Sequence, residues 1–143
     1  MSAYSHTPLT VGLRASLTAE VTGADTAEAL GSGDVPVLGT PRLLALAEAA
    51  CVAAVAPQLA DGQTTVGIAV SLEHKRASPV GTAIEVEADL AGIEGRKLFF
   101  NFIAYGPGEG DEAVIGAGTV ERMLVDRDRF LRSAGQTPVV DRG

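Results

Sequence analysis

The spacing of apolar and polar positions predicts one long helix followed by four strands. We expect the helix to begin at Thr40-Pro41, because threonine favours the N-cap and proline the first helical position. It should end near residues 57–59, before an exit turn that contains glycine. Between Leu43 and Ala56 its only charged residue is Glu48. Since a helix that is apolar on all sides is typical of a protein interior, we predict that this helix is buried.

Strands are predicted on both sides of this helix. Before it, a loose alternation over residues 9–21 indicates a strand, and residues 23–34 are expected to form a loop. Residues 35–38 should form at most an edge strand, because they include a proline. After the helix, alternating residues predict strands over 63–76, 82–90, 97–105 and 112–125. Tight connections between these strands favour an antiparallel sheet. A sheet of this size with one buried helix should curl round it in an α+β fold.

Length and composition place the chain among folded single-domain proteins. The sequence has 143 residues, 46% of them apolar, and we predict one domain over residues 1–128 followed by a polar C-terminal tail over 129–143. The net charge of −7 argues against general nucleic-acid binding, which needs a basic surface. A sheet with a free edge and an uncovered apolar flank is commonly completed by dimerisation.

Targeting and metal-binding patterns are not apparent. We find no apolar run long enough to span a bilayer and no leader-like start, so we expect a cytoplasmic protein that does not contact a membrane. The single cysteine, Cys51, excludes an internal disulfide and is expected to be a small buried residue. No pair of cysteines or histidines has the spacing of metal ligands, so we expect no metal.

Glu48 is the first candidate for chemistry. Helical spacing places it on one stripe with Leu44, Cys51 and Val55. Burying an unpaired carboxylate costs on the order of several kcal/mol, so Glu48 should find a partner or hold a proton. Carboxylates in such surroundings are typical of acid–base catalysis. The alternative is a glutamate at the edge of the helix that reaches water.

His74 is the second candidate. It continues a row of alternate apolar residues that we expect to face the helix, namely Val66, Ile68, Val70 and Leu72. On this interpretation His74 and Glu48 share one cavity, where the imidazole could move protons and the carboxylate could orient it. A core histidine without a function is the alternative.

Two further positions have both a structural and a functional interpretation. Thr40 could simply cap the helix, or its hydroxyl, beside the free N–H groups of the helix start, could bind an oxyanion or attack a carbonyl. Gly67, expected on the face opposite to His74, could mark the close approach of a ligand or of another backbone, or a β-bulge.

Several short segments together resemble the fluoroacetyl-CoA thioesterase family of hotdog-fold proteins over about residues 10–128. The matching segments are Gly39-Thr40-Pro41, Glu48-Ala49-Ala50-Cys51-Val52, Thr64-Thr65-Val66-Gly67, His74 with Ala77-Ser78-Pro79-Val80-Gly81, Glu94-Gly95-Arg96, and Gly116-Ala117-Gly118-Thr119 with Glu121-Arg122. The resemblance implies a homodimer, a sheet wrapped round a helix, and hydrolysis of acyl-CoA thioesters, with CoA as part of the substrate and no separate cofactor. It implies catalytic roles for Thr40, Glu48 and His74, and substrate-binding roles for Gly67 and Arg122.

The family's chemistry leaves several points open. Either Thr40 or Glu48 could attack the thioester, or Glu48 could activate water, with His74 moving protons. We expect the phosphates of CoA to bind local cations near His74, among them Lys75, Arg76, Arg96, Lys97 and Arg122.

The acyl group is not predicted. Residues 31–38 lack the phenylalanines that form a lid in the fluoroacetyl-specific member, so the thioester chemistry is carried over without that preference. A hotdog-fold enoyl-CoA hydratase and a non-catalytic acyl-CoA-binding dimer are the alternatives.

Overall fold

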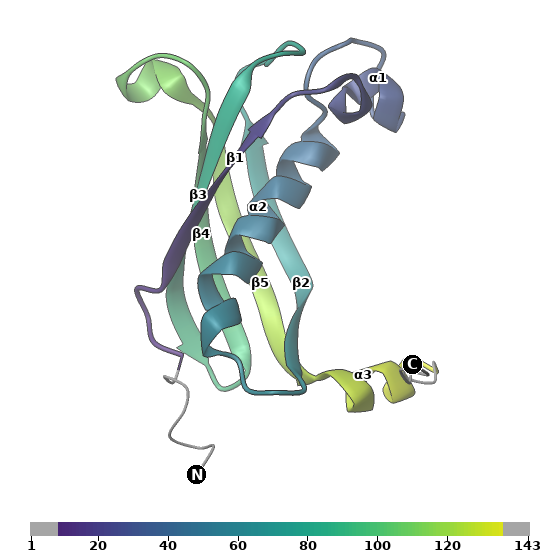
Figure 1. Cartoon of the computed structure of the whole chain (residues 1–143), viewed down its shortest axis with the longest axis vertical. Helices are drawn as coiled ribbons and strands as arrows, with labels where there is room; N and C mark the ends of the chain where they lie inside the picture. The colour runs from purple at the N-terminus through teal and green to yellow at the C-terminus, as the bar shows by residue number, and fades with distance from the viewer. Residues whose placement is uncertain (1–8, 136–143) are drawn as a thin grey trace.

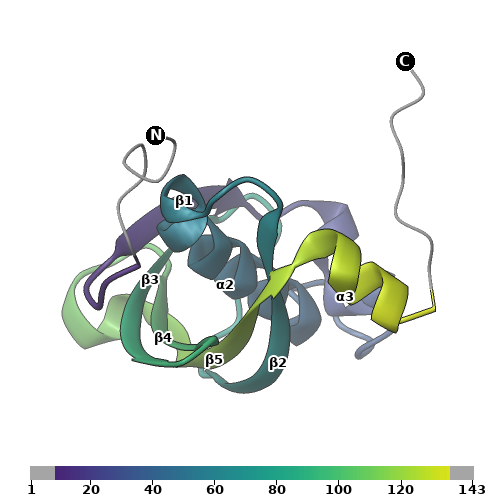
Figure 2. The same cartoon turned by 90° about the horizontal axis from the view of Figure 1, so that it is seen from below.

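A five-stranded antiparallel sheet forms the body of the protein, and it curls along one long helix (Figure 1). The computed structural model describes residues 9–135. The strands are β1 (Arg14–Glu20), β2 (Gln63–His74), β3 (Ala83–Glu94), β4 (Lys97–Tyr105) and β5 (Val114–Asp126). Their order in the sheet is β1-β3-β4-β5-β2, so β1 and β2 are the edges. The predicted α+β arrangement is confirmed, and Figure 2 shows the sheet wrapping round the helix.

The long helix α2 (Thr40–Val55) continues into the short 3-10 helix η3 (Ala56–Gln58). Gly39, rather than Thr40, is the N-cap, and Pro41 lies in the first turn. The helix packs mainly against β1 and β3, and hardly against β2. One side is therefore buried, with Leu43, Leu46, Ala47, Ala50, Cys51, Ala54 and Val55.

The opposite side of α2 is exposed, so the prediction of a helix buried on all sides is wrong for the single chain. Ala45, Ala49 and Val52 on this side are apolar and open to solvent. By length and hydropathy alone, the helical segment Thr40–Gln58 could also cross a membrane, which the sequence analysis did not anticipate. Its packing on the sheet accounts for much of this apolar composition.

A β-bulge interrupts strand β2 between Gly67 and Ala69. Gly67 pairs with Arg122 and Val70 pairs with Val120, and both partners in β5 are buried beneath the helix. The extra residue is Ile68, and it reverses the alternation of faces along the strand. Thr65 and Gly67 therefore face the same side as Val70, Leu72 and His74. The predicted inward row is wrong at Val66 and Ile68, and the prediction that Gly67 faces away from His74 is wrong for the same reason.

The remaining elements are short. Residues 23–34, predicted as a loop, contain the 3-10 helix η2 (Gly23–Asp25) and α1 (Ala27–Leu30). Residues 35–38 form no strand, only isolated bridges of Leu38 to Thr26 and of Val37 to Pro79. The 3-10 helix η4 (Gly110–Ala113) precedes β5. Helix α3 (Arg127–Ser133), capped by Asp126, lies where the sequence analysis predicted the start of a polar tail; residues 1–8 and 136–143 lie outside the described part of the chain.

Candidate active site

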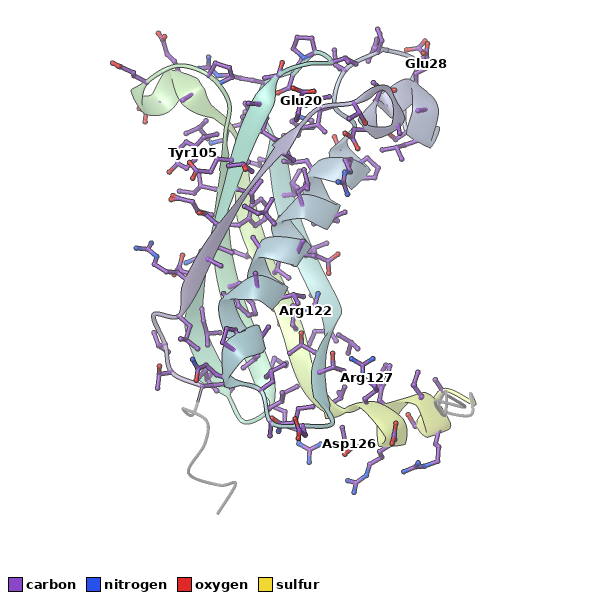
Figure 3. All side chains as sticks on the ribbon, in the orientation of Figure 1. Glu20, Glu28, Tyr105, Arg122, Asp126 and Arg127 are labelled. Atoms are coloured by element: carbon purple, nitrogen blue, oxygen red, sulfur yellow. The ribbon has the colours of Figure 1, made fainter. Side chains whose placement is uncertain are left out.

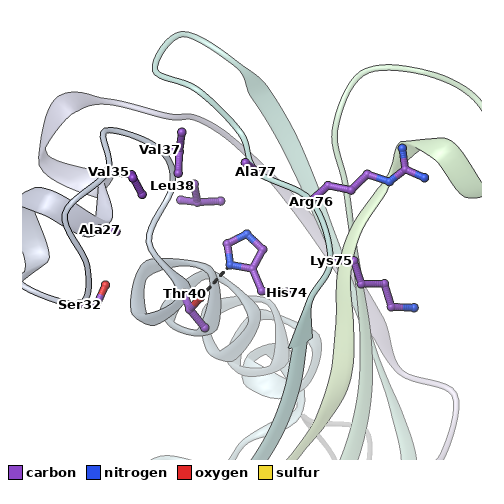
Figure 4. Close-up of a pocket in the computed structure, with 10 residues that line it drawn as sticks. All are labelled: Ala27, Ser32, Val35, Val37, Leu38, Thr40, His74, Lys75, Arg76 and Ala77. Carbon is purple, nitrogen blue, oxygen red and sulfur yellow. Dashed lines mark hydrogen bonds between the residues drawn. The ribbon is translucent and has the colours of Figure 1, made fainter.

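Thr40 and His74 meet where helix α2 begins and strand β2 ends (Figure 4). The distance between Thr40 Oγ1 and His74 Nδ1 is 2.8 Å. The start of the helix is fixed because the Gly39 N–H donates to the Asp25 carbonyl. The end of the strand is fixed because the N–H groups of Lys75 and Arg76 both donate to the Ile115 carbonyl. Two local anchors therefore hold this pair, although the residues are 34 positions apart in the sequence.

The second ring nitrogen of His74 is free for a ligand. Nε2 is buried, and no described residue forms a hydrogen bond with it. Burial lowers the pKa of His74 below its ordinary value of 6.5, with a smaller opposing effect of the Arg76 backbone. The imidazole is consequently neutral at neutral pH. In the tautomer that carries its hydrogen on Nε2, Nδ1 accepts the hydroxyl hydrogen of Thr40.

A cavity of about 280 Å³ lies beside His74. Much of its wall is apolar and consists of Ala27, Val35, Val37, Leu38 and Ala77. Lys75 and Arg76 border the cavity, but their side chains point away from His74 in Figure 4. The space next to the imidazole therefore suits an uncharged group, and the two cations lie outside it.

Glu48 belongs to a different cluster, in the middle of helix α2. Its Oε2 accepts a hydrogen bond from Arg122 Nη1 at 2.8 Å. Arg122 also donates from Nε to Thr65 Oγ1 and from Nη2 to the Thr65 carbonyl, both at 2.9 Å. Arg122, labelled in Figure 3, is 7% exposed, whereas the Glu48 side chain is one-third exposed. The prediction that Glu48 finds a partner is confirmed, and it also reaches water in the single chain.

Gly67 lies directly against this ion pair. A Cβ atom at Gly67 would lie 2.5 Å from Glu48 Oε2 and 3.3 Å from Arg122 Nη1. The alternative interpretation of Gly67, a β-bulge, is present, whereas the group that approaches Gly67 is the carboxylate of Glu48 and neither a ligand nor another backbone. The missing side chain therefore leaves room for Glu48.

The structure does not bring all the predicted site residues into one cavity of a single chain. Glu48 does not line the cavity beside His74. Thr40 and Glu48 are eight residues apart on α2, about 12 Å along its axis. The expectation that Glu48 and His74 share a cavity is therefore not met within one chain.

The predicted group of cations is also divided. His74 pairs with Gly116 at one end of β5, whereas Lys97 pairs with Met123 near the other end. Arg96 and Lys97 are thus far from His74, and their predicted place beside it is wrong. Arg122 is buried and forms three hydrogen bonds with Thr65 and Glu48, so it is not a surface cation. Lys75 and Arg76 are the two predicted cations that border the cavity.

Thr65 is the residue that sequence reasoning missed. It contributes two of the three acceptors that bind Arg122, yet the two residues are 57 positions apart. The sequence analysis placed Thr65 on the opposite face, because it assumed an unbroken alternation along β2 and did not apply the possible bulge at Gly67. Cys51 is buried as predicted, and its burial raises the pKa of the thiol to about 12. Within residues 9–135, no three His, Cys, Asp or Glu side chains are grouped to hold a metal ion.

Comparison with known proteins gives a consistent result. A family model described as fluoroacetyl-CoA-specific thioesterase matches residues 21–128. The fluoroacetyl-CoA thioesterase of Streptantibioticus cattleyicolor is 36% identical over 94 residues, which are 66% of this chain. The matched region spans 65% of the length of that relative.

Solved structures share the fold over most of the chain. A threonine-to-serine variant of a fluoroacetyl-CoA thioesterase, in complex with acetyl-CoA, has a TM-score of 0.81 and 28% identity. The similarity covers 89% of this chain and 97% of that one. A hot-dog-like protein from Thermanaerovibrio acidaminovorans has a TM-score of 0.79 at 17% identity, covering 89% and 91% of the two chains. The hotdog fold predicted from the sequence is thereby confirmed.

Proposed function

The chain belongs to the family of fluoroacetyl-CoA-specific thioesterases, and from this membership we propose that it hydrolyses an acyl-CoA thioester to a free acid and CoA. The observation that carries the proposal is the hydrogen bond between Thr40 Oγ1 and His74 Nδ1 beside an apolar cavity. A hydroxyl held by a neutral imidazole is the arrangement that activates a nucleophile. A related enzyme has been solved with acetyl-CoA, which supports an acyl-CoA as the substrate.

In the proposed reaction Thr40 is the nucleophile and His74 the general base. The hydroxyl proton passes to His74 Nδ1 while Oγ1 attacks the thioester carbonyl. The C–S bond then breaks, the leaving thiolate takes the proton from the imidazolium, and the acyl group stays on Thr40 as an ester. In the second half, a water molecule gives a proton to His74 and attacks this ester. The acyl C–O bond to Thr40 then breaks, Oγ1 takes the proton back from the imidazolium, and the free acid leaves. Water is the only co-reactant, and no further cofactor is required.

The cavity beside His74 is the proposed acyl site. Its apolar wall accepts an uncharged acyl group, and His74 Nε2 can donate to the carbonyl oxygen. Lys75 and Arg76 lie outside the cavity, where the phosphates of CoA can reach them. Gly67 borders the substrate next to Glu48, and Arg122 acts on the substrate through that carboxylate.

Glu48 is the proposed third catalytic residue, and its use requires a second copy of the chain. Ala45, Ala49 and Val52 expose an apolar side of α2, and Ile68 and Val70 are 45% and 48% exposed on the neighbouring edge strand β2. An edge strand with an exposed apolar surface is a pairing site. We infer a cytoplasmic homodimer that buries this surface and brings Glu48, which lies on it, to a Thr40–His74 pair. There the carboxylate would orient or activate the hydrolytic water.

Release of free thiol from a panel of short, branched and aromatic acyl-CoAs tests the activity. Thr40→Ala, His74→Ala and Glu48→Gln should each lower kcat at least about a hundredfold, the range of acid–base and nucleophilic contributions. Thr119→Ala and Glu85→Gln, on the outer face of the sheet, are matched controls that should leave kcat unchanged. Hydration of crotonyl-CoA without thiol release would instead establish a hydratase. Tight binding without turnover, unaffected by these substitutions, would establish a binding protein.

The mass of the protein in solution, measured by sedimentation, tests the dimer. Ile68→Asp places a charge on the proposed interface and should yield an inactive monomer. Ile103→Asp is the matched control, because Ile103 is comparably exposed (39%) but lies on the central strand β4, away from the edge strand β2. An Ile68→Asp protein that remains an active dimer would contradict this interface.

A further inference from the structure

We propose that Thr65 is a positioning residue that fixes the carboxylate of Glu48 for hydrolysis by holding Arg122. The inference rests on the proposed function, in which Glu48 is catalytic. It concerns a residue that does not line the cavity beside His74 and whose side chain bonds to Arg122 and not to Glu48. Its effect is passed on through the guanidinium.

Thr65 determines the orientation of the guanidinium by offering two acceptors to one planar group. Nε of Arg122 donates to the Thr65 hydroxyl, and Nη2 donates to the Thr65 carbonyl. Because the N–H groups of a guanidinium have a rigid, forked geometry, these two bonds define its plane and direction. Nη1 then points at Glu48 Oε2, 2.8 Å away. Thr65 on β2 thus orients Arg122 on β5, and Arg122 in turn determines the position of the Glu48 carboxylate on α2.

Burial makes this anchor difficult to replace. Thr65 and Arg122 are each 7% exposed. Without the Thr65 hydroxyl, the Nε–H group would lose its acceptor in a place that water scarcely reaches. The guanidinium would then turn toward another acceptor and displace Nη1 from Glu48. The Thr65 carbonyl would remain, so the side chain would be misdirected rather than released.

The bulge in β2 supplies a matched control one residue away. Thr65 and Gly67 lie two positions apart before the bulge, so both face the inner side of the sheet. Gly67 contacts Glu48 there. Neighbouring side chains of a strand point to opposite faces, so Thr64 lies on the outer face. Thr64 is half-buried and has no hydrogen bond to Arg122. The two threonines therefore have the same side chain and nearly the same place in the sequence, but different surroundings.

The steady-state kinetics of thiol release by Thr65→Val, Thr65→Ser and Thr64→Val test the proposal. Valine keeps the shape of threonine and removes the acceptor. Thr65→Val should lower kcat about tenfold to a hundredfold, the equivalent of one hydrogen bond to a charged group, with KM changed less than about twofold. Thr65→Ser restores the hydroxyl and should recover most of kcat, and Thr64→Val should match the wild type. Thr65→Ala serves the same comparison if the valine variant does not fold.

A double substitution separates positioning from general structural support. If Thr65 acts through Glu48, Thr65→Val should lower the residual rate of Glu48→Gln less than about twofold. An equal loss in both backgrounds, equal losses in the valine and serine variants, or an unchanged kcat in Thr65→Val would each overturn the inference. None of these outcomes would contradict the proposed function, because the wild type would still release thiol. Absence of thiol release from the wild type would overturn the proposed function, and this inference with it.

Discussion

Gly67→Ala should lower kcat about tenfold to a hundredfold while leaving the fold almost intact. The new methyl group would lie 2.5 Å from Glu48 Oε2, closer than carbon and oxygen atoms can approach without bonding. The backbone need not move, because the obstructing atom is the end of a long side chain. The φ angle of Gly67 is not among the positive values of this chain, so alanine adds no backbone strain.

The size of the loss in kcat follows from the hydrogen bond between Glu48 and Arg122 that the new methyl group would disturb. To restore a normal contact distance, the carboxylate must move several tenths of an ångström, while the 3.3 Å distance to Nη1 also crowds the guanidinium. The 2.8 Å hydrogen bond between them would then be broken or lengthened. A hydrogen bond to a charged group contributes about 1.5–3 kcal/mol, which corresponds to a fall in kcat of about tenfold to a hundredfold. Because Glu48 is one-third exposed, water can replace part of this bond, and the free energy of unfolding should fall by no more than about 1 kcal/mol.

Thiol-release kinetics and denaturant unfolding, measured on the same preparations, separate the two effects. Gly92→Ala is the matched control, because Gly92 also lies next to a register shift, in β3, and its Cβ would make ordinary contacts of 3.5 Å and more with Phe99. It should retain the wild-type kcat. If Gly67→Ala turns over at the wild-type rate, or loses stability and activity in proportion, the space at Gly67 does not serve Glu48 as argued here.

Three further predictions concern His74, the buried thiol of Cys51 and the cavity beside His74. Since burial lowers the pKa of His74 below 6.5 and its neutral form is the base, the acid-side decline of kcat/KM should be centred below pH 6.5; a decline centred above pH 6.5 would contradict this. Iodoacetamide at pH 8 should not alkylate Cys51 in the native protein, because the pKa of the thiol is about 12, but should do so after unfolding, as mass spectrometry can determine. Val37→Phe should fill the cavity beside His74 and lower kcat/KM for long acyl chains at least about tenfold more than for acetyl-CoA, whereas the exposed control Val80→Phe should not alter the chain-length profile.

Most of the fold could be predicted because hydrophobic spacing depends on local geometry. The strand predicted over residues 82–90 corresponds to part of β3, and its even-numbered residues Ile84, Val86, Ala88 and Leu90 are buried. Helix α2 begins at the predicted threonine. A β-bulge was only one interpretation of Gly67, and its effect on the faces of β2 was not predicted, because Ile68 is apolar and continues the apparent alternation through the point where the face changes. A single inserted residue therefore moved Thr65 to the inner face without altering the visible pattern.

The two halves of the candidate site differ in how far the sequence could reveal them. Thr40 lies at the start of the helix and His74 at the end of the next strand, and the sequence analysis grouped them only through the family resemblance. The contact of Glu48 with Arg122 joins residues 74 positions apart and depends on the register of β5 against β2. Spacing along the chain carries no information on that register. Arg96 and Lys97 were misplaced for the same reason.

The surroundings of Glu48 make most sense in the proposed dimer. A glutamate that is one-third exposed gains little from a salt bridge, because water solvates it well. Yet Arg122 is almost fully buried and is held by two bonds to Thr65, although burying such an arginine is itself costly. Ala45 and Ala49, small residues on either side of Glu48, allow a second copy to approach closely and exclude that water. The same ion pair would then lie in a medium of lower dielectric constant, where attraction between charges is stronger. A buried arginine therefore stabilises Glu48 more in the proposed dimer, where water is excluded, than in an isolated chain, where water already solvates the carboxylate.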